Sequence, residues 1–596
     1  MALSIGSFSG LAPKVNPPLL AANMATVASN LRVDRGSIRP LKGVSFVASL
    51  PSGAQSFFKY SSTAWLYWAN ANVDIARSPV PNDAWGRIYY TGGEAAYPQY
   101  TFSGQPTVSG LTNGLSPNGM RLGVPQPGVG TLASIGKSGT ITGTAYNRYY
   151  VFCYVTPQGE EGPPLKYPVP VNNITSTETA TLTFATETLS TYNLAAGSNV
   201  SQSAFVAGRI YTIATAGDCN WTAIGAAAAT VGVVFTYNGL PITGSTGTAL
   251  YASGFRRIYR TAQGTNYTTF EFVADVPIGV TTYADSLVDT QLGEIIPSTS
   301  WFPPPAGMIG LKATANGFFI GFTGNTLCVS ARFMPHAWPP AYELSFPGTI
   351  TAIAVTTDSI VVFTSDMPYL VTGTDPASLT AIKIDNPQSV PFRKSAVDMG
   401  GYVLAASPDG LIKIVQSQIT NATLDYFTYE QWQAYSPSTL RGFFYEGIYI
   451  GFSSTKAFMF DMRKAPYTLT TLAGFSTFVA GYNDLSTDIL YLLDSTGAIY
   501  TWETGALSSF TWKSKPVRVQ NPVCPACGRI YANYASGAVG LTLWADGVIK
   551  FGPTTISSSE SFRLPAGYRA REFTVQLTGT SEVDSISMAN SVAELA

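Results

Sequence analysis

One histidine in this sequence has the side chain of a general base, and its surroundings decide whether that chemistry is available. His336 is the only histidine of the 596 residues and stands in R-F-M-P-H-A-W-P-P-A-Y, between Pro335 and Trp338. Histidine acts as a base when it is paired with a nucleophile, as in a catalytic triad. No G-x-S-x-G nucleophile elbow accompanies it. We therefore expect His336 to pack in a turn rather than to catalyse.

A closely spaced cysteine pair, C-P-A-C at Cys524 and Cys527, has the spacing of two metal ligands. A tetrahedral zinc site needs two more ligands, and neither a second pair nor a nearby histidine supplies them. The pair does not precede a helix in a βαβ context, which disfavours a redox role. We predict structural thiols and no metal or cofactor. Five cysteines in all give no disulfide framework: Cys153, Cys219, Cys328, Cys524 and Cys527.

Two other kinds of chemistry leave weak traces. The stretch G-T-L-A-S-I-G-K-S from Gly130 has one residue too many between its glycines for a phosphate-binding loop. Asp and Glu are scattered through turns such as S-P-D-G, and most of these residues belong to hairpins. Paired carboxylates for glycoside hydrolysis remain an open alternative. We expect no enzyme.

The composition indicates a long, multi-domain, all-β protein. Charged residues make up 12% and aromatic residues 13%, with 33 Tyr, 56 Gly and 39 Pro. A net charge of −1 argues against a surface that grips nucleic acid by neutralising phosphates, but it suits a channel through which DNA slides. There is no signal-peptide pattern, and residues 223–235 are too short an apolar run to span a bilayer. We expect synthesis in a reducing cytoplasm.

One short pattern recurs between residues 317 and 503: an apolar strand, a tight polar turn and a second apolar strand. The copies align at steps of 42, 42, 46 and 42 residues on Phe319, Val361, Val403, Tyr449 and Tyr491. A period just over 40 residues, with about four strands per unit, is typical of a β-propeller blade. Residues 300–514 are therefore predicted to hold propeller blades. A run of hairpins in a sandwich is the alternative, because WD and kelch signatures are absent.

Residues 55–92 contain four more strand patterns and are predicted to form one further blade, distant in sequence, that helps to close the ring. With the five later copies this gives about six blades. Residues 93–137 are rich in Gly, Pro, Ser and Asn and are predicted to be linker or loops.

Residues 1–54 are predicted to be an N-terminal arm followed by a docking segment. Prolines interrupt residues 8–22, which we expect to order only against neighbouring chains. Asn23 to Leu31 could form a short helix capped by Asn23. Residues 32–43 concentrate three Arg and one Lys beside Gly36 and Pro40. This segment is either a charged docking hairpin for a partner or a solvated turn between strands.

Two further β domains flank the predicted propeller in the sequence. Residues 138–290 resemble a fibronectin type III-like sandwich, with a Tyr-rich strand that ends in a G-E-E-G-P turn. Residues 189–250 form an insertion in it, similar to a small β module that recurs in phage tail and fibre proteins. Residues 515–596 return to alternating β, and Phe573, Val575 and Leu577 share one face of a strand.

The ordered set of segments resembles the tail nozzle proteins (tail tubular protein B) of short-tailed bacteriophages. The segments are G-L-A-P-K-V-N-P-P-L-L, A-S-N-L-R-V-D-R-G-S-I-R-P-L-K-G, W-L-Y-W-A-N-A-N-V-D-I-A-R-S-P, F-M-P-H-A-W-P-P-A-Y, M-P-Y-L-V-T-G-T-D-P-A-S-L and L-P-A-G-Y-R-A-R-E-F…G-T-S-E-V-D-S-I-S-M-A. The similarity spans most of the chain except residues 189–250, which depart from the simpler family pattern.

The resemblance implies a non-enzymatic, structural virion protein of the phage tail, assembled in the host cytoplasm. It would form a hexamer below a dodecameric adaptor ring, contact tail fibres or other tail proteins, and line the distal channel through which DNA leaves without sequence-specific binding. Contact with the host envelope is also implied. The candidate adaptor or subunit contacts are Arg32, Arg35, Gly36, Arg39, Pro40, Arg569 and Arg571.

Two rival functions stay open. A propeller that degrades host polysaccharide would need two or more carboxylates converging in a pocket at the propeller axis. A receptor-binding protein would use the inserted module as its adhesin.

Overall fold

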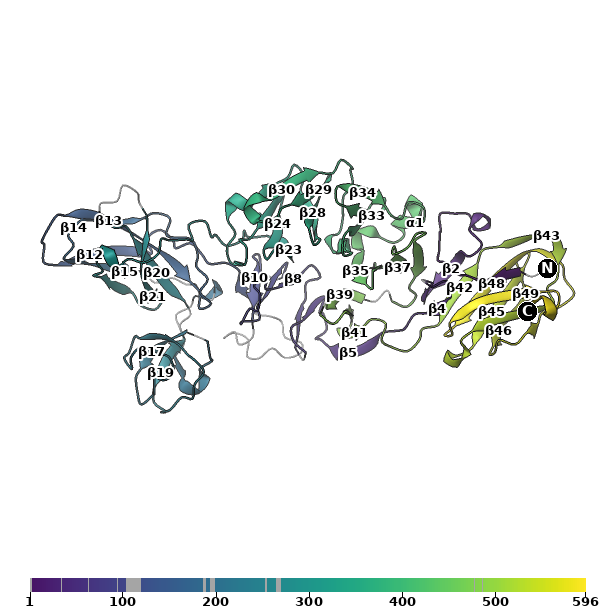
Figure 1. Cartoon of the computed structure of the whole chain (residues 1–596), viewed down its shortest axis with the longest axis horizontal. Coiled ribbons are helices and arrows are strands. Elements are labelled where there is room, and N and C mark those ends of the chain that lie inside the picture. The colour runs from purple at the N-terminus through teal and green to yellow at the C-terminus, as the bar shows by residue number, and fades with distance from the viewer. Residues whose placement is uncertain are drawn as a thin grey trace.

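The computed structural model describes residues 3–595 except 34, 63, 94, 103–118, 186–188, 193, 195–198, 209, 252–253, 264–268, 476–477 and 485. Strands are the main regular structure of the described residues, which contain one short α-helix, α1 (Tyr429–Gln433). Figure 1 shows an elongated molecule, in which a central unit separates a sandwich from a domain that holds both chain ends. The predicted multi-domain, all-β fold class is confirmed. In the described part of the chain, no helix combines the length and apolarity that crossing a membrane requires.

Seven sheets surround a common axis in the central unit. Their strands, sheet by sheet, are β6–β7 (Ser56–Lys59, Trp65–Trp68); β8–β11 (Asp74–Arg77, Ile88–Thr91, Gln99–Thr101, Met120–Arg121); β23–β26 (Ile309–Ala313, Phe319–Thr323, Thr326–Val329, Leu344–Ser345); β27–β30 (Ile350–Val355, Ser359–Thr364, Pro368–Thr372, Thr380–Lys383); β31–β34 (Val397–Asp398, Val403–Ser407, Gly410–Val415, Gln418–Asn421); β35–β38 (Arg441–Tyr445, Ile448–Phe452, Ala457–Asp461, Thr468–Thr471); and β39–β41 with β5 (Phe478–Asp484, Ile489–Asp494, Ala498–Thr501, Ser45–Ser49).

The first strands of these sheets touch in sequence around the ring. Contacts run from β6 to β39, β35, β31, β27, β23 and β8. Phe58 of β6 and Ile75 of β8 share an apolar cluster, which completes the circle. The unit is therefore a β-propeller, and β5 from the N-terminal region closes its last sheet against β41. β5 thereby covers the edge that β41 would otherwise expose.

The repeat read from the sequence marks equivalent places in five of these sheets. Each aligned residue lies on the second strand of its sheet and is buried: Phe319, Val361, Val403, Tyr449 and Tyr491. The periodic pattern therefore corresponds to a real structural repeat. Neighbouring sheets of the ring cover both faces of the second strand, so residues on both of its faces are apolar. This continuous apolar run is why the repeat is visible in the sequence.

The prediction of a single blade at residues 55–92 is wrong. The hairpin β6–β7 forms one sheet, and β8–β9 begin the next. Between them the Asn70 side chain accepts a hydrogen bond from the Asn72 backbone N–H, a local turn that carries the chain from one sheet to its neighbour. The ring therefore has seven sheets where we expected about six. Residues 93–137 are not only linker, because β10 and β11 complete the second of these sheets.

The sandwich consists of two facing sheets. One holds β12 (Leu132–Gly139), β15 (Glu178–Phe184) and β22 (Thr282–Asp285); the other holds β14 (Val169–Ile174), β13 (Tyr146–Val155), β20 (Phe255–Arg260) and β21 (Glu271–Pro277). One apolar cluster joins them, with Phe152 from one sheet and Leu182 from the other. The domain begins at Leu132, before the predicted boundary at 138, because Leu132 pairs with Phe184.

The inserted module has a sheet and an apolar cluster of its own. Its strands are β16 (Asn199–Ser201), β19 (Thr248–Tyr251), β17 (Ile210–Thr215) and β18 (Val234–Thr236). The cluster includes Trp221, whose indole N–H donates to the Ala216 carbonyl. In Figure 1 the module lies beside the sandwich, away from the axis of the molecule. It enters the chain between β15 and β20, where an insertion leaves both sandwich sheets intact.

The C-terminal domain contains strands from both ends of the chain. One sheet holds β1 (Leu3–Ile5), β49 (Val583–Ala589), β44 (Cys527–Ala532) and β47 (Phe562–Arg563). The other holds β2 (Ala25–Ser29), β42 (Phe510–Ser514), β48 (Ala570–Gly579), β45 (Val539–Ala545), β46 (Val548–Ile556) and β43 (Val517–Val523). The helix expected at Asn23–Leu31 is wrong, because β2 pairs there with β42 and with β38 of the propeller. So short a helix has little stability of its own, and strand pairing prevails.

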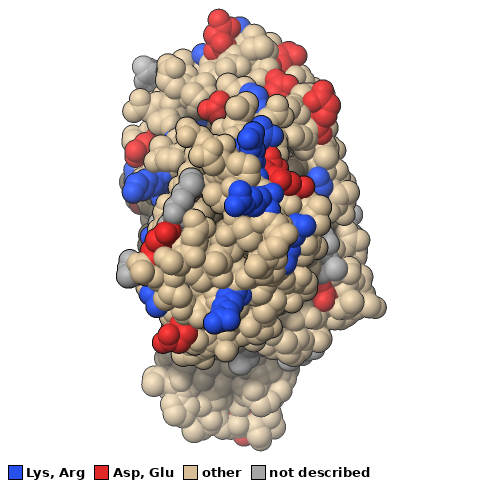
Figure 2. Space-filling model, turned by 90° about the vertical axis from the view of Figure 1, so that its right-hand side faces the viewer, with Lys and Arg blue, Asp and Glu red and all other residues tan. Residues whose placement is uncertain are grey.

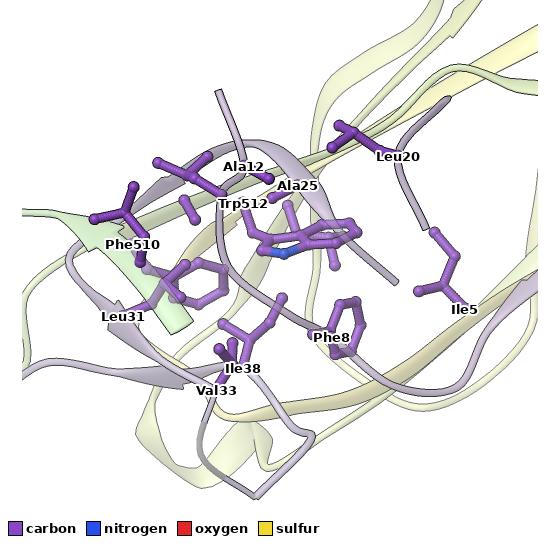
Figure 3. Packing of buried hydrophobic residues seen from close by; sticks show 14 of the residues in the cluster. Ile5, Phe8, Ala12, Leu20, Ala25, Leu31, Val33, Ile38, Phe510 and Trp512 are labelled. Carbon is purple, nitrogen blue, oxygen red and sulfur yellow. The ribbon is translucent and has the colours of Figure 1, made fainter. Parts of the chain in front are cut away.

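The proline-broken arm packs on this same domain, so the expectation that it orders only against neighbouring chains is wrong. Phe8 lies edge-on to Trp512, with ring centroids 4.8 Å apart, and the indole N–H donates to the Ser9 carbonyl at 3.1 Å. Figure 3 shows the two rings among apolar side chains from the N-terminal residues and β42. Leu11, Ala12 and Leu20 are buried too. The prolines interrupt secondary structure here but leave apolar side chains to pack.

Replacing Phe8 by Ala should loosen the C-terminal domain by about 3 kcal/mol, since it empties a buried aromatic site. Hydrogen exchange at the amides of β2 and β42 measures this loss locally. Leu19→Ala is the matched control, because Leu19 is 76% exposed. Equal protection in the Phe8 variant and the wild type would contradict the packing described for the arm.

Candidate functional site

The predicted docking segment forms a hairpin that is wedged between two domains. Its strands, β3 (Leu31–Arg32) and β4 (Arg39–Pro40), pair Leu31 with Pro40 and Arg32 with Arg39. Gly36 turns the chain at φ +86°, and its carbonyl accepts from the Phe8 backbone N–H at 2.8 Å. Ile38 bridges to Val583 of β49. The segment is therefore a hairpin that packs against its own chain. Its docking to a partner stays a prediction.

Arg32 ties this hairpin to the propeller. Its guanidinium contacts Glu446, in the β35–β36 turn, at 2.5 Å and also Glu503, just after β41. The Arg32 side chain is 5% exposed, and it lies against the Tyr445 ring. Burial raises the pKa of Glu503, although Arg32 acts in the opposite direction. Both of these partners are within the chain, so Arg32 joins parts of one subunit, and its predicted contact with another subunit or the adaptor stays a prediction.

The other predicted contact residues divide into two groups. Arg39 and Pro40 line a cleft of about 390 Å³ together with Arg32, Lys42, Glu446, Glu503 and Glu582, so charges of both signs meet there. Arg35 is exposed in the hairpin turn. Arg569 and Arg571 are also exposed but lie elsewhere, near the start of β48, where the Arg571 backbone N–H donates to Asp546. The ten residues of β48 span about 30 Å, which keeps this pair apart from the hairpin.

A second candidate site lies on the propeller axis. A cavity of about 500 Å³ is lined by residues from the first strand of every sheet in the ring. Examples are Phe58 of β6, Ile75 of β8, Lys312 of β23, Ile353 of β27, Val397 of β31, Phe443 of β35 and Tyr482 of β39. Its ionisable side chains are Asp74, Lys312, Arg393, Lys394, Asp398 and Arg441, together with Tyr482. Sequence reasoning missed these residues, although the Arg393–Lys394 pair before a predicted strand was a visible signal.

Asp74 is the centre of an ion-pair network across this axis. Its carboxylate accepts from Lys394 Nζ at 2.8 Å, from Arg393 Nε at 3.0 Å and from the Gly310 backbone N–H at 3.1 Å. Burial alone would raise the pKa of Asp74, but Lys394 and Arg393 hold it at about 2. The two cations lie in the 3-10 turn η7 (Arg393–Ser395), which contacts β27 and β35. They therefore fix β8 to strands farther round the ring.

The cavity has one other carboxylate, Asp398, and its environment differs. It accepts from the Gly400 backbone N–H at 2.8 Å, and burial raises its pKa. A polysaccharide-degrading site would need one carboxyl group as an acid and another as a base or nucleophile. The cations beside Asp74 hold its pKa at about 2, which makes its carboxylate a weak base. Asp74 is therefore better described as the centre of a structural ion-pair network, and Asp398 as a separate, exposed acid.

His336 lies where the sandwich meets the propeller. Its Nδ1 is 3.6 Å from a carboxylate oxygen of Glu160, which comes from the turn at the end of β13. Arg87 contacts the same oxygen and also pairs with Asp83 at 2.8 Å. Burial alone would raise the pKa of Glu160, but His336 and Arg87 hold it at about 2. Arg87, Asp83 and Glu160 form a buried charge cluster that joins the two domains, and His336 packs beside it.

The cysteines take structural positions among the described residues. Cys527 is buried, with its thiol against the Ala589 carbonyl at 3.5 Å, and Cys524 lies near the Pro565 carbonyl at 3.6 Å. In the described ranges, no group of three or more His, Cys, Asp or Glu side chains is placed to hold a metal ion.

Comparisons with known proteins add little to this geometry. No protein-family model and no curated protein matches the chain. Among solved structures, the extracellular domain of a one component system from B. thetaiotaomicron is 9% identical, with a TM-score of 0.25, over 57% of this chain and 43% of that one. BamB from Moraxella catarrhalis is 10% identical, with a TM-score of 0.22, over 52% of this chain and 97% of that one. This chain therefore spans less than half the length of the first of these proteins.

Replacing Arg32 by Met should weaken the junction between hairpin and propeller by about 3 kcal/mol, because it leaves two carboxylates without their shared cation. Hydrogen exchange at β4 and at the β35–β36 turn reports this opening. Adding Glu503→Gln should recover part of the loss, and Arg35→Met, at an exposed site, should change nothing. A loss as small in the Arg32 variant as in the Arg35 variant would show that the ion pairs are not stabilising.

Acid should release the sandwich from the propeller. Glu160 has a pKa of about 2 in the folded protein, against an ordinary value of 4.5. Its carboxylate therefore stabilises the folded contact above pH 4.5, and this contribution is lost as the pH falls towards 2. Small-angle scattering between pH 5 and 2.5 should show the junction opening. Glu160→Gln should be looser already at pH 5 and flatter in its pH response. Glu294→Gln, an exposed change on the same domain, should follow the wild type.

Proposed function

We propose that this protein is a structural component of a short-tailed phage tail, a nozzle subunit that assembles as a ring below the adaptor and encloses the distal DNA-ejection channel. The resemblance of the sequence segments to tail nozzle proteins supports this proposal. These segments lie in β domains that could form the wall of a channel. The N-terminal and C-terminal segments build one end domain, and the central segments build the propeller. We propose no enzymatic activity for the protein.

The observation that carries the proposal is the way the domains are fixed to one another. A single sheet continues from β35–β38 of the propeller through β2 into the C-terminal domain, and Arg32 adds ion pairs at the same junction. At the other end, Glu160 and Arg87 join the sandwich to the propeller. A wall that must keep its shape while DNA passes needs joints of this kind, whereas independent domains would move.

The charge distribution is also compatible with this function. Figure 2 looks at the end of the molecule opposite the sandwich and shows Lys and Arg side chains near the middle of that face, with Asp and Glu among and around them. Arg569 and Arg571 are exposed on this C-terminal domain and remain our candidates for contacts with the adaptor or another subunit. Arg35 is exposed at the domain junction and is the third candidate for such a contact. A net charge of −1 leaves no strong attraction that would retain passing DNA.

The test is the assembly state of the purified full-length chain. Negative-stain imaging and light scattering should show six-fold rings with an axial channel, alone or after mixing with the purified adaptor. The double variant Arg569→Glu, Arg571→Glu should lose ring assembly or adaptor binding while it keeps its folded circular dichroism spectrum. Lys383→Glu, an exposed change on β30, is the control. A chain that stays monomeric with the adaptor, or that releases sugars from a capsular polysaccharide, would overturn the proposal.

A further inference from the structure

The charges that line the axial cavity do not balance. Four cations and two carboxylates line it, and Arg393 and Lys394 both pair with Asp74. Lys312 and Arg441 remain. Burial acts to raise the pKa of Asp398 and of Asp74, and the charge of Lys312 acts to lower it. In the part of the chain that the structure describes, Lys312 nevertheless forms no ion pair within 4.0 Å, and neither does Arg441. Arg441 lies near the Phe392 ring, 5.6 Å from its centroid, and burial lowers its pKa. A half-buried guanidinium without an anion is costly, so an anionic ligand would stabilise it.

The two cations line the same cavity from β23 and β35, which β27 and β31 separate in the ring. Lys312 pairs with Ile320, one residue after the repeat position Phe319, and Phe443 pairs with Ile450, one residue after Tyr449. Lys312 and Phe443 therefore occupy equivalent levels in their sheets. Arg441 is two residues before Phe443, a step of about 7 Å along the strand, and both cations line the same cavity.

The rest of the cavity suits an apolar body. Phe443, Phe444 and Tyr482 line it and are half-buried, so their rings are partly accessible from the cavity. A neighbouring hollow of about 320 Å³ shares Lys312, Ala396 and Asp398 with it. A volume of about 500 Å³ is in the range of small-molecule sites.

We propose that the axial cavity of the propeller binds a small organic anion, whose phosphate or carboxylate group is held by Lys312 and Arg441 and whose apolar body lies against Phe443 and Tyr482. Charge-assisted hydrogen bonds to an oxyanion are the strongest that these side chains make. Asp74 pairs with the other two cations, Arg393 and Lys394, and holds the wall in place. Asp398 lines both hollows and opposes the anion. This site is independent of the nozzle function, because it lies within one subunit.

Isothermal titration calorimetry on the full-length chain at low ionic strength tests the proposal with three probes. Phenyl phosphate should bind more tightly than inorganic phosphate if the apolar wall contributes. Comparison of phenyl phosphate with benzoate distinguishes a phosphate from a carboxylate as the preferred head group. No heat of binding from either aromatic probe at about 10 mM overturns the proposal, since this concentration detects even millimolar affinity.

Variants assign the binding to the cavity. Lys312→Gln and Arg441→Gln should each raise the Kd of the better aromatic probe about tenfold. Lys383→Gln removes the same charge from an exposed strand outside the cavity and should leave the Kd unchanged. Asp398→Asn should lower the Kd, an effect that a merely destabilised protein would not show, and its side-chain oxygen still accepts from Gly400. A Kd unchanged in both cation variants overturns the site.

Discussion

The molecule depends on the pairing of its first fifty residues with strands that are far away in the sequence. β1 and β2 complete the two sheets of the C-terminal domain, the β3–β4 hairpin fills the junction, and β5 closes the propeller. Each of these strands satisfies backbone groups that would otherwise lie at a sheet edge. Because one continuous segment does all three, neither the end domain nor the ring is complete without it. The arrangement of the domains therefore follows from the path of this segment.

Much of the fold could be predicted from the sequence where the signal was periodic. The spacing of Phe319, Val361 and Val403 located the second strands of their sheets, because a strand covered on both sides must be apolar throughout. The alternation of Phe573, Val575 and Leu577 located a half-buried strand in the same way. The sandwich and its insertion were predicted from their resemblance to known modules, and in the structure each has an apolar cluster of its own.

The errors share a physical cause, which is that local patterns do not specify distant partners. Residues 25–29 resemble a weak helix by themselves and become a strand because β42 and β38 flank them. The arm at residues 8–22 has no regular structure, yet Phe8 finds Trp512 more than 500 positions away. Arg32 was predicted to contact another subunit or the adaptor, and nothing local in the sequence shows that Glu446 and Glu503 of its own chain pair with it. The axial cavity was missed for the same reason, since each sheet contributes only a few of its lining residues.

The closure of the propeller by β5 has a consequence for how the protein is made. β5 leaves the ribosome early, but its partner β41 ends at Thr501 and follows almost the whole of the ring. The ring can therefore close only late in synthesis, and until then several of its strand edges await partners. The sandwich and its module are contiguous in the chain and complete their sheets long before that point. A nascent chain thus carries two finished domains beside an open ring, and the release of the last hundred residues decides when the whole becomes rigid.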